Sequence, residues 1–393
     1  MNYKTLEAAL ASCRCFASSN PAARASDSLP SQPRRQFLAG LAAVGAGSLL
    51  SGHASLLDAQ ALAQAPAAKP RRIDTHHHFT PPTWVAALQQ AGLKSGREKW
   101  SVDASLETMD RGGVEMAVIS PGPFLYRLGD KFYDVMAHLS RDANEFGAKM
   151  VVDHPRRYAL FAQLPLPDTD LTLKEIEYAS DKLKAVGFSV NTNYGENYIG
   201  DPMFTPVLEE LNRRKAIVFS HPYPFKIGNH SFDQEELTTH NIRSVLGLTG
   251  EGGGDEEKDE ERGKNGIDLK YPNITFLFSH AGGTMPMVIQ RIVRREPAQN
   301  LDKPAAPNSV LGRIRRFYCD TSQAYNSAAM GALKNVMTTS HILFGTDQLN
   351  AASEDNPKHT VEGLESCGVF DATELQAIYR GNALRLFPQF DKT

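Results

Sequence analysis

The sequence has few cysteines and no strong excess of charge of either sign. Four of its 393 residues are cysteines, namely Cys13, Cys15, Cys319 and Cys367, and no two of them form a CxxC pair. This pattern excludes a cysteine-based zinc motif and a disulfide framework. The formal net charge of -3 gives no reason to expect a polyanionic partner, so nucleic-acid binding is not expected.

The sequence also lacks an apolar run of the about 20 residues that a membrane helix needs. A shorter run follows Arg34 and Arg35 in RRQFLAGLAAVGAGSLL, and small residues suited to cleavage come after it. This segment resembles a twin-arginine signal peptide. We therefore expect residues 1–63 to be a leader cleaved after Ala63, residues 64–71 to be a linker, and the mature protein to be periplasmic without a membrane span. A disordered leader with a chance arginine pair is the alternative.

No Gly-rich phosphate turn follows the first expected strand, which argues against an open dinucleotide-binding sheet. Instead, short apolar runs recur along residues 72–393, and each is followed by a segment with helical spacing. Eight such units predict an α/β fold, a closed (β/α)8 TIM barrel of the metal-dependent hydrolase type. The expected strands span residues 72–74, 116–120, 158–164, 186–191, 216–220, 274–279, 317–320 and 342–345.

Helices are expected between these strands, for example over residues 132–151, 171–184 and 203–214. The third places Phe204, Val207, Leu208 and Leu211 on one face, after Asp201 as a cap and Pro202 in the first turn. Residues 249–266 interrupt the alternation of expected strands and helices, because they carry seven acidic residues among Gly, Lys and Arg. We expect a solvated insertion there.

His76 and His78 stand two residues apart in the segment RRIDTHHHF, directly after the first expected strand. Residues i and i+2 of a strand face the same side, so the two imidazoles should project together while His77 points to the opposite face. Such a pair can chelate a metal. A structural histidine cluster would give the same letters, and the segment alone does not separate these interpretations.

Other metal-capable side chains also follow expected strands directly. His221 follows the fifth strand, His280 follows the sixth in ITFLFSHAGG, and Asp347 follows the eighth in ILFGTDQ. Active sites of barrels of this kind lie at the C-terminal ends of the strands. We therefore expect these residues to converge with His76 and His78 at one mouth of the barrel, as a metal site.

This order of residues resembles the amidohydrolase superfamily. The runs DTHHHFTPP, HAGG, FGTD and RGNALRLFP are similar to those of its aminocarboxymuconate-semialdehyde decarboxylase branch in the amidohydrolase-related family 2, particularly the methylsalicylate-decarboxylase-like members. The resemblance covers roughly residues 72–390. It implies a metal-dependent enzyme that forms a homodimer.

One departure from the wider superfamily bears on the number of metals. Binuclear members place a carboxylated lysine at the end of strand four, whereas this strand ends in VNTN. The resemblance therefore implies one divalent metal, zinc or manganese, with His76, His78, His221 and Asp347 as ligands. It also implies that His280 hydrogen-bonds the substrate or a metal-bound water without binding the metal itself.

The branch implies a carboxy-lyase that acts on an aromatic or unsaturated carboxylic acid such as a hydroxybenzoate. His280 or Asp347 would deliver a proton to the carbon that bears the carboxylate. The same residues also permit hydrolysis of a lactone, ester or amide, with Asp347 taking a proton from metal-bound water. Export keeps this alternative open, because aromatic catabolism is mostly intracellular. A third alternative is a periplasmic barrel that binds metal without catalysis.

Residues that contact the substrate are harder to identify from the sequence. Arg97 and Lys99 can bind a carboxylate, but a solvated basic loop is the favoured interpretation of these two residues. Four aromatic residues just past strand ends can line an aromatic pocket or pack in the ordinary way, namely Phe79, Phe124, Tyr126 and Tyr223. Tyr325 and Asn326, after strand seven, also lie near the expected mouth, and we assign them no role.

Overall fold

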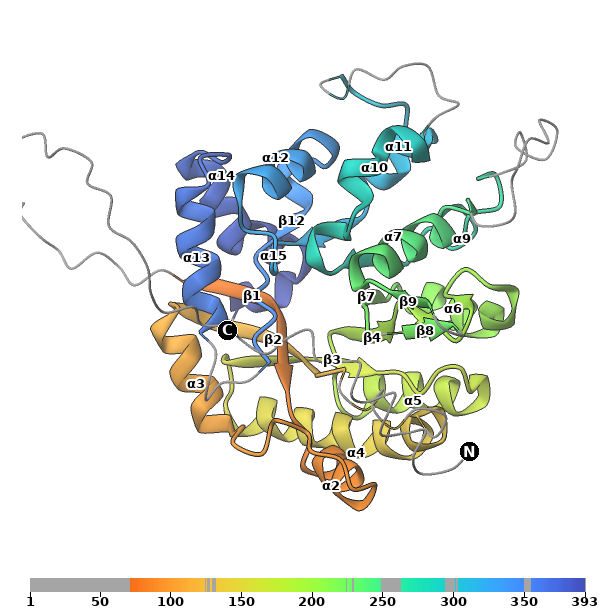
Figure 1. The fold of residues 1–393 in the computed structure, drawn as a ribbon, viewed down its shortest axis with the longest axis vertical. Coiled ribbons are helices and arrows are strands. Elements are labelled where there is room, and N and C mark those ends of the chain that lie inside the picture. The colour runs from red at the N-terminus through yellow and green to blue at the C-terminus, as the bar shows by residue number, and fades with distance from the viewer. Residues whose placement is uncertain are drawn as a thin grey trace, which may run out of the picture. The chain divides into compact units, whose positions relative to one another are not determined.

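The structure is a computed structural model (Figure 1). It describes residues 71–123, 125, 128, 132–223, 225–227, 230–248, 263–293, 301, 303–349 and 355–392. The expected leader, residues 64–70 of the expected linker and residues 249–262 of the acidic insertion lie outside these ranges. In the described part, no helix combines the length and the apolar character that crossing a membrane requires.

Eight parallel strands form one sheet in the order β1-β2-β3-β4-β7-β10-β11-β12. This order follows the chain, as expected when each strand is added beside the previous one by a right-handed crossover. All eight predicted strands are therefore confirmed. Their bounds are β1 Arg72–Phe79, β2 Val114–Pro121, β3 Tyr158–Gln163, β4 Gly187–Asn191, β7 Ile217–His221, β10 Thr275–Phe278, β11 Tyr318–Asp320 and β12 Ile342–Leu343.

The first strand is longer than the sequence predicted. It was expected to end at Asp74, but β1 continues through the three histidines to Phe79. This extension has a backbone cause, because the segment after β12 runs parallel to β1 and exchanges hydrogen bonds with it. The Thr75 N–H donates to the Phe344 carbonyl at 2.9 Å, and the His78 N–H donates to the Gln348 carbonyl at 3.0 Å. These bonds close the sheet into a barrel.

Helices follow the strands and lie outside the barrel (Figure 1). Between β1 and β4 they are α2 Pro82–Gln90, α3 Val102–Arg111, α4 Phe132–Asp153 and α5 Thr169–Asp181. The next are η2 Pro202–Phe204, α6 Thr205–Arg213, α7 Gln234–Val245, α9 Ile267–Lys270, η3 His280–Gly282, α10 Met285–Ile292 and α11 Val310–Ile314. The last are α12 Ser327–Val336, η4 Thr339–His341, α13 Asn356–Ser366, α14 Ala372–Gln376, η5 Ala377–Gly381, α15 Asn382–Leu386 and η6 Pro388–Lys392.

The local signals for helix starts behave as predicted. The Asp201 side chain accepts a hydrogen bond from the Met203 N–H at 3.0 Å, with Pro202 in the first turn. Asp168 caps α5 in the same way, accepting from the Leu171 N–H at 2.8 Å. A cap oxygen satisfies one of the backbone donors that a helix start leaves unpaired. The apolar stripe of α6 is buried, as its spacing predicted.

Successive side chains along a strand point to opposite faces of the sheet, so the apolar core has one part inside the barrel and another between the barrel and the helices. Phe161, Phe219 and Leu277 belong to the inner cluster, which fills the barrel below His221. The Phe161 and Phe219 rings stack there with their centroids 5.5 Å apart. Phe387, just after α15, contacts Phe161 and closes the inner cluster from the C-terminal segment. The interior of the barrel is a packed core, and the buried side chains of His78 and His221 lie at the C-terminal ends of its strands.

Two short hairpins and a small apolar cluster were not predicted. The hairpins are β5 Asn193–Tyr194 with β6 Asn197–Tyr198, and β8 Phe225–Ile227 with β9 His230–Phe232, which follow β4 and β7. The cluster contains Trp84, Leu88, Leu125, Met136, Ala143 and Tyr223. It brings α2, α4 and the loop after β7 together beside the C-terminal ends of the strands.

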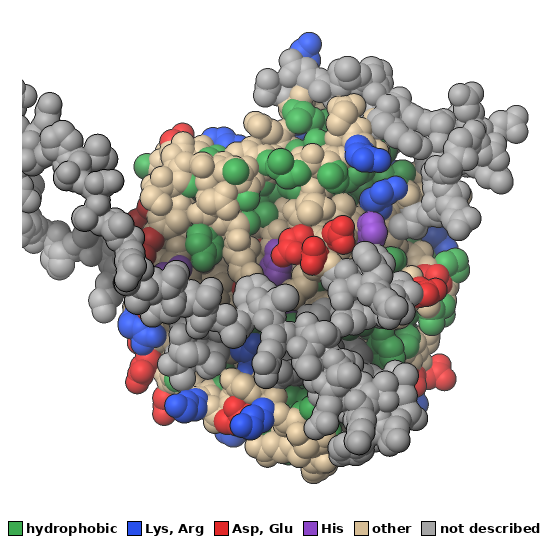
Figure 2. Space-filling model, viewed as in Figure 1, with side chains coloured by type: hydrophobic (Ala, Val, Ile, Leu, Met, Phe, Trp, Pro, Cys, Tyr) green, Lys and Arg blue, Asp and Glu red, His purple; other side chains and the backbone are tan. Residues whose placement is uncertain are grey.

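On the face shown in Figure 2, the described acidic and basic side chains are interspersed.

Candidate metal centre

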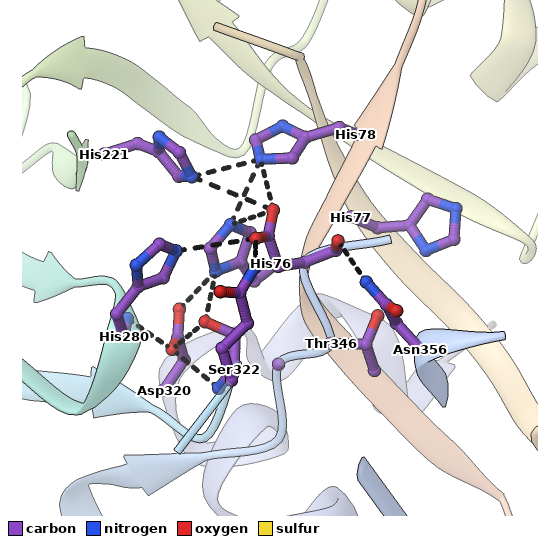
Figure 3. A network of polar contacts seen from close by, with 12 residues as sticks. His76, His77, His78, His221, His280, Asp320, Ser322, Thr346 and Asn356 are labelled. Carbon is purple, nitrogen blue, oxygen red and sulfur yellow. Dashed lines mark hydrogen bonds and ion pairs between the residues drawn. The ribbon is translucent and has the colours of Figure 1, made fainter. Parts of the chain in front are cut away.

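Four buried side chains gather at the C-terminal mouth of the barrel (Figure 3). They are His76 and His78 on β1, His221 at the end of β7, and Asp347 after β12. One ligand atom from each lies within 4.8 Å of the others. The convergence predicted from strand order is therefore present in the fold.

The separations of these atoms match a single metal ion. The His76 Nε2 atom lies 3.1 Å from His78 Nε2 and 3.3 Å from Asp347 Oδ1. The His78 Nε2 atom lies 3.3 Å from His221 Nε2. Ligands at about 2.1 Å from a metal, arranged tetrahedrally, are about 3.4 Å apart. The buried site of three histidines and one aspartate thus fits one divalent metal.

Each of the three histidines has its other ring nitrogen held by an oxygen. His76 Nδ1 lies 2.7 Å from Asp320 Oδ2, and His221 Nδ1 lies 2.6 Å from the Pro222 carbonyl. His78 Nδ1 lies 3.3 Å from the Ser120 carbonyl. A proton on Nδ1 donates to these acceptors and leaves the Nε2 lone pair directed at the centre of the cluster.

Asp320 is a functional residue that the sequence reasoning missed. It ends β11, is fully buried, and also accepts from the His280 N–H at 2.9 Å through Oδ1. Ser322 adds a third contact, since its hydroxyl donates to Asp320 Oδ1 at 2.7 Å. The available signal was position: Asp320 is the last residue of a predicted strand, where barrel site residues lie.

Asp74 has a similar bracing role on the other side of β1. Its carboxylate accepts from the His76 N–H at 3.0 Å and from the Thr346 hydroxyl at 2.6 Å. It also lies 3.1 Å from His77 Nδ1. His77 points away from the cluster, as its position in the strand predicted, and its Nε2 contacts the Ser105 hydroxyl (Figure 3). The first and last strands are therefore fixed to each other next to two candidate ligands.

Asp347 is held in an unusual backbone conformation. Its φ of +53° lies in the left-handed region, and its N–H donates to the His76 carbonyl at 2.8 Å. Gln323 Nε2 donates to Asp347 Oδ2, which leaves Oδ1 facing the histidines. Gly345 permits this approach, since a Cβ there would lie 2.9 Å from the His76 Cβ and 2.7 Å from the Asp320 Cβ. The glycine of the FGTD run is thus explained, because the backbone at Gly345 lies too close to His76 and Asp320 to leave room for a side chain.

His280 lies beside the four ligands. Its ring is stacked on His76 with the centroids 5.4 Å apart and an angle of 9° between the planes. Its Nε2 atom is 3.6 Å from Asp347 Oδ2, and neither ring nitrogen has a hydrogen-bond partner. The HAGG run shapes this placement, because His280, Ala281, Gly282 and Gly283 all have positive φ. A buried imidazole with both nitrogens available is poised to contact a ligand.

Burial sets the protonation of most of these imidazoles. It lowers the pKa of His78, His221 and His280 to about 4 each, so the three rings are neutral at pH 7. Burial also acts to lower the pKa of His76, but the Asp320 and Asp347 carboxylates outweigh it and raise that pKa to about 10. A metal that binds His76 Nε2 must therefore displace a proton.

Burial on its own would raise the pKa of the Asp347 carboxyl. The neighbouring imidazoles, His76 foremost, hold it well below its usual range instead. The carboxylate is therefore ionised across the neutral pH range. Together with neutral imidazoles it forms a donor set suited to a cation.

A cavity opens next to His221. Three strand ends supply its polar floor and the apolar cluster supplies part of its wall, with the lining residues Trp84, Pro121, Pro123, Leu125, Met136, Gln163, Ser189, Asn191 and His221. Because His221 belongs to both the cavity and the four-ligand cluster, the cavity adjoins the candidate metal centre.

The structure places the residues that were candidates for substrate contacts in different environments. Phe79 packs in the outer core and Tyr223 is buried beside the cavity, where its hydroxyl lies 3.0 Å from that of Tyr133. Phe124 and Tyr126 lie outside the described residues. Burial is the main cause that lowers the pKa of His78, and the positive charge of Arg97 makes a smaller contribution in the same direction. Lys99 is exposed.

Tyr325 and Asn326, which had no assigned role, line a second cavity near Asp347. Gln323, Leu349 and Asn356 complete its lining. The Asn326 side chain caps α12 by accepting from the Ala328 and Ala329 N–H groups. This is a structural role, so Asn326 is not counted among the site residues.

Known proteins are similar to this chain in sequence and in fold. The 6-methylsalicylic acid decarboxylase of Penicillium expansum is 32% identical over 81% of this chain and 96% of its own length. The 2-amino-3-carboxymuconate-6-semialdehyde decarboxylase of Dictyostelium discoideum is 24% identical over 80% of this chain and 90% of its own. These relatives agree with the predicted decarboxylase branch.

A solved structure supports the fold. The dihydroxybenzoic acid decarboxylase from Polaromonas sp. JS666, with bound manganese and the inhibitor 2-nitroresorcinol, has a TM-score of 0.63 to this chain. It is 20% identical and is covered over 97% of its length, against 81% of this chain. The amidohydrolase family model matches residues 73–389, which include every residue of the metal centre. The chain belongs to the amidohydrolase family.

Proposed function

We propose that this protein is a metal-dependent decarboxylase of an aromatic carboxylic acid, with hydroxybenzoates of the methylsalicylate kind as its substrate class. One observation carries the proposal: a metal-binding donor set lies at the end of a cavity with apolar walls, and His280 stands beside it with both ring nitrogens unpartnered. The resemblance to the Penicillium expansum decarboxylase of 6-methylsalicylic acid supports the substrate class.

We assign the metal to His76, His78, His221 and Asp347 and propose zinc, with manganese as the alternative. Imidazole nitrogens with one carboxylate suit zinc, and the manganese in the Polaromonas structure supports the alternative. When bound, the metal would act as a Lewis acid and template for the carboxylate and the neighbouring oxygen substituent of the substrate.

The chain itself supplies the proton. His280 Nε2 and Asp347 Oδ2 lie 3.6 Å apart at the site, and we assign proton delivery to this pair. A proton added to the ring carbon that bears the carboxylate makes that carbon tetrahedral. The bond to the carboxylate then breaks, its electron pair restores the aromatic ring, and carbon dioxide leaves. One proton is taken up for each carbon dioxide released.

Burial decides which proton His280 can deliver. Since burial lowers the pKa of its imidazole to about 4, the ring is neutral at pH 7 and carries a single N–H proton. The other ring nitrogen can take up a proton in its place. The apolar walls of the cavity also keep water from the reacting carbon.

The reaction is tested by offering the metal-loaded protein a panel of hydroxybenzoates, 6-methylsalicylate included, together with aryl lactones and esters. We expect carbon dioxide and the matching phenol from the benzoates. The His76→Ala, His78→Ala double variant is the control and should release neither. Turnover of a lactone or ester without carbon dioxide would replace the proposal with a hydrolase, and retained metal without any turnover would replace it with a non-catalytic metal-binding barrel.

We also propose that the protein is exported by the twin-arginine route, acts in the periplasm and forms a homodimer. The arginine pair before a short apolar run supports the route. Export of a folded protein suits a metalloenzyme, because the metal can be loaded before the site meets competing ions outside. Fractionation tests the export and the location of the protein, and light scattering of the mature protein tests the homodimer.

A further inference from the structure

The two oxygens of the Asp347 carboxylate have different surroundings. Gln323 lies in the loop after β11, and its Nε2 donates a hydrogen bond to Asp347 Oδ2. The other oxygen, Oδ1, has no hydrogen-bond partner among the described residues. It lies 3.3 Å from His76 Nε2 and 3.2 Å from His78 Nε2. One oxygen therefore faces the candidate metal ligands, and the other faces a neutral amide.

This difference bears on how a carboxylate binds a metal. A carboxylate turns about the bond to its Cβ atom, and its two oxygens are equivalent unless their neighbours differ. It can bind a metal through one oxygen or through both. An N–H donor on one oxygen opposes that rotation, and a neutral amide leaves the negative charge in place. The donor at Oδ2 therefore leaves Oδ1 as the oxygen that is turned toward a metal.

The fold fixes the backbone next to Gln323 relative to Asp347. The Thr321 hydroxyl donates to the Gly345 carbonyl at 3.1 Å, and the Gly345 N–H donates to the same hydroxyl at 3.1 Å. Thr321 precedes Gln323 by two residues, and Gly345 precedes Asp347 by two residues. The reciprocal hydrogen bonds therefore join the two segments just before the residues whose side chains meet.

Both residues also have a left-handed backbone. The φ angle is +54° at Gln323 and +53° at Asp347. Residues other than glycine rarely adopt this conformation, and such residues cluster at functional sites when the surrounding structure holds them there. At Asp347 part of this hold comes from Asn356, whose Nδ2 donates to the Asp347 carbonyl at 2.7 Å. The contact between the two side chains is thus built on a backbone that the fold constrains.

Gln323 also separates the carboxylate from solvent. Asp347 is 2% exposed, whereas Gln323 is exposed and lines the second cavity. Of the described residues that line this cavity, Gln323 is the one that hydrogen-bonds the carboxylate, because Asn356 binds the Asp347 backbone instead. Replacing the Gln323 amide therefore removes the donor to Oδ2 and leaves the four candidate ligands in place.

The oxygen that Gln323 binds is also the one near His280. His280 Nε2 lies 3.6 Å from Asp347 Oδ2. If Oδ2 turned toward the metal, it would move away from this imidazole. Holding Oδ2 in place thus keeps the two proposed proton-delivery groups together.

We propose that Gln323 is a positioning residue, which holds the Asp347 carboxylate so that Oδ1 alone binds the metal and Oδ2 stays beside His280. The inference rests on the metal assignment in the proposed function. Partners that hold a ligating side chain in this way contribute about 10- to 100-fold to metal affinity or activity.

Cobalt(II) bound in place of the native metal tests the number of oxygens that bind. Its visible absorption weakens when the ion gains a ligand, and the measurement needs no substrate. Gln323→Met and Gln323→Glu keep about the length of the side chain but remove the N–H donor. We expect a weaker visible band per bound cobalt in both variants than in the wild type, because both Asp347 oxygens then reach the metal. We also expect kcat to fall by about 10- to 100-fold while KM stays within about threefold.

Tyr325→Phe is the matched control. It removes a hydroxyl from a neighbouring residue that lines the same cavity, and it leaves the donor to Asp347 in place. This variant should keep the cobalt band and the kcat of the wild type. An unchanged band in both Gln323 variants, or an equal change in Tyr325→Phe, would overturn the inference.

The cobalt band separates this inference from the proposed function, because it is measured without turnover. If the wild type releases no carbon dioxide but both Gln323 variants weaken the band, the decarboxylase proposal fails while the assignment of Gln323 stands. If the wild type releases carbon dioxide and neither variant changes the band, the outcome is the reverse. A wild type that binds no cobalt overturns the inference together with the metal assignment.

Discussion

The Asp320 carboxylate lies 2.7 Å from His76 Nδ1, and both side chains are fully buried although 244 positions separate them in the chain. An anion at this distance fixes the ring orientation and makes Nε2 a better donor to a metal. Asp320→Asn keeps the shape but removes the charge. We expect its metal affinity to fall by about 10- to 100-fold, measured by competition with a chelator.

Ser322→Ala is the control for this experiment. The Ser322 hydroxyl lies 2.9 Å from the same His76 nitrogen but carries no charge. Its removal should weaken metal binding less than the loss of the Asp320 charge. Equal losses in the two variants would show that the charge of Asp320 is not what supports His76.

The metal content of the purified protein tests the ligand assignment. We expect about one equivalent of divalent metal in the wild type, since the four ligand atoms surround one point. The His76→Ala, His78→Ala double variant should contain almost none. His77→Ala is a matched control on the same strand, because His77 faces Asp74 and Ser105 instead of the cluster. Equal metal in the wild type and the double variant would refute the site.

Arg313 and Asp268 form a buried ion pair outside the site. Arg313 Nε donates to Asp268 Oδ2 at 2.8 Å, and Arg313 is 2% exposed. Arg313→Met leaves the Asp268 carboxylate buried without its main partner, so the free energy of unfolding should fall by about 3–5 kcal/mol. Chemical denaturation measures it.

Adding Asp268→Leu to Arg313→Met tests the cause of that loss. The double variant has no lone buried carboxylate, so it should be more stable than Arg313→Met alone. If the losses of the two single variants simply add, the pairing of these charges is not the reason for the effect.

Gly283 lies at the turn that carries His280. Its φ of 66° and ψ of -135° favour glycine, and a Cβ there would lie 2.2 Å from the Glu235 carbonyl oxygen. Gly283→Ala should lower the free energy of unfolding by about 2 kcal/mol or more. Gly331, inside α12, has no atom within 4 Å of such a Cβ, so Gly331→Ala should raise the melting temperature slightly. Thermal unfolding of both variants checks this contrast.

The export proposal depends on Arg34 and Arg35. Replacing both with Lys keeps the charge but removes the arginine pair, so we expect the protein to stay in the cytoplasm. Cell fractionation with an antibody to the mature protein measures this. Undiminished export of the variant would refute the twin-arginine route.

The ligand set was predictable because it depends on rules that act along the chain. Strand alternation placed His76 and His78 on one face, and strand order placed His221 and Asp347 at the same mouth. These rules need only the position of a residue in its strand. The fold class and the four-ligand cluster therefore followed from local patterns repeated eight times.

The supporting residues were not predictable for a physical reason. Asp74 and Asp320 act through contacts with residues 272 and 244 positions away, and no local pattern reports such contacts. The left-handed backbone at Asp347 and the pairing that extends β1 to Phe79 also arise only when the barrel closes.

The seam between β1 and the segment after β12 joins the beginning and the end of the barrel. Thr346 donates to Asp74 across 272 positions, and His76 and Asp347 lie on its two sides. A ribosome therefore releases His76 and His78 long before the residue that completes their site. A chain that stops before Phe344 carries three histidine ligands but neither the seam nor the carboxylate. Only a chain that extends through Asp347 therefore contains all four candidate metal ligands.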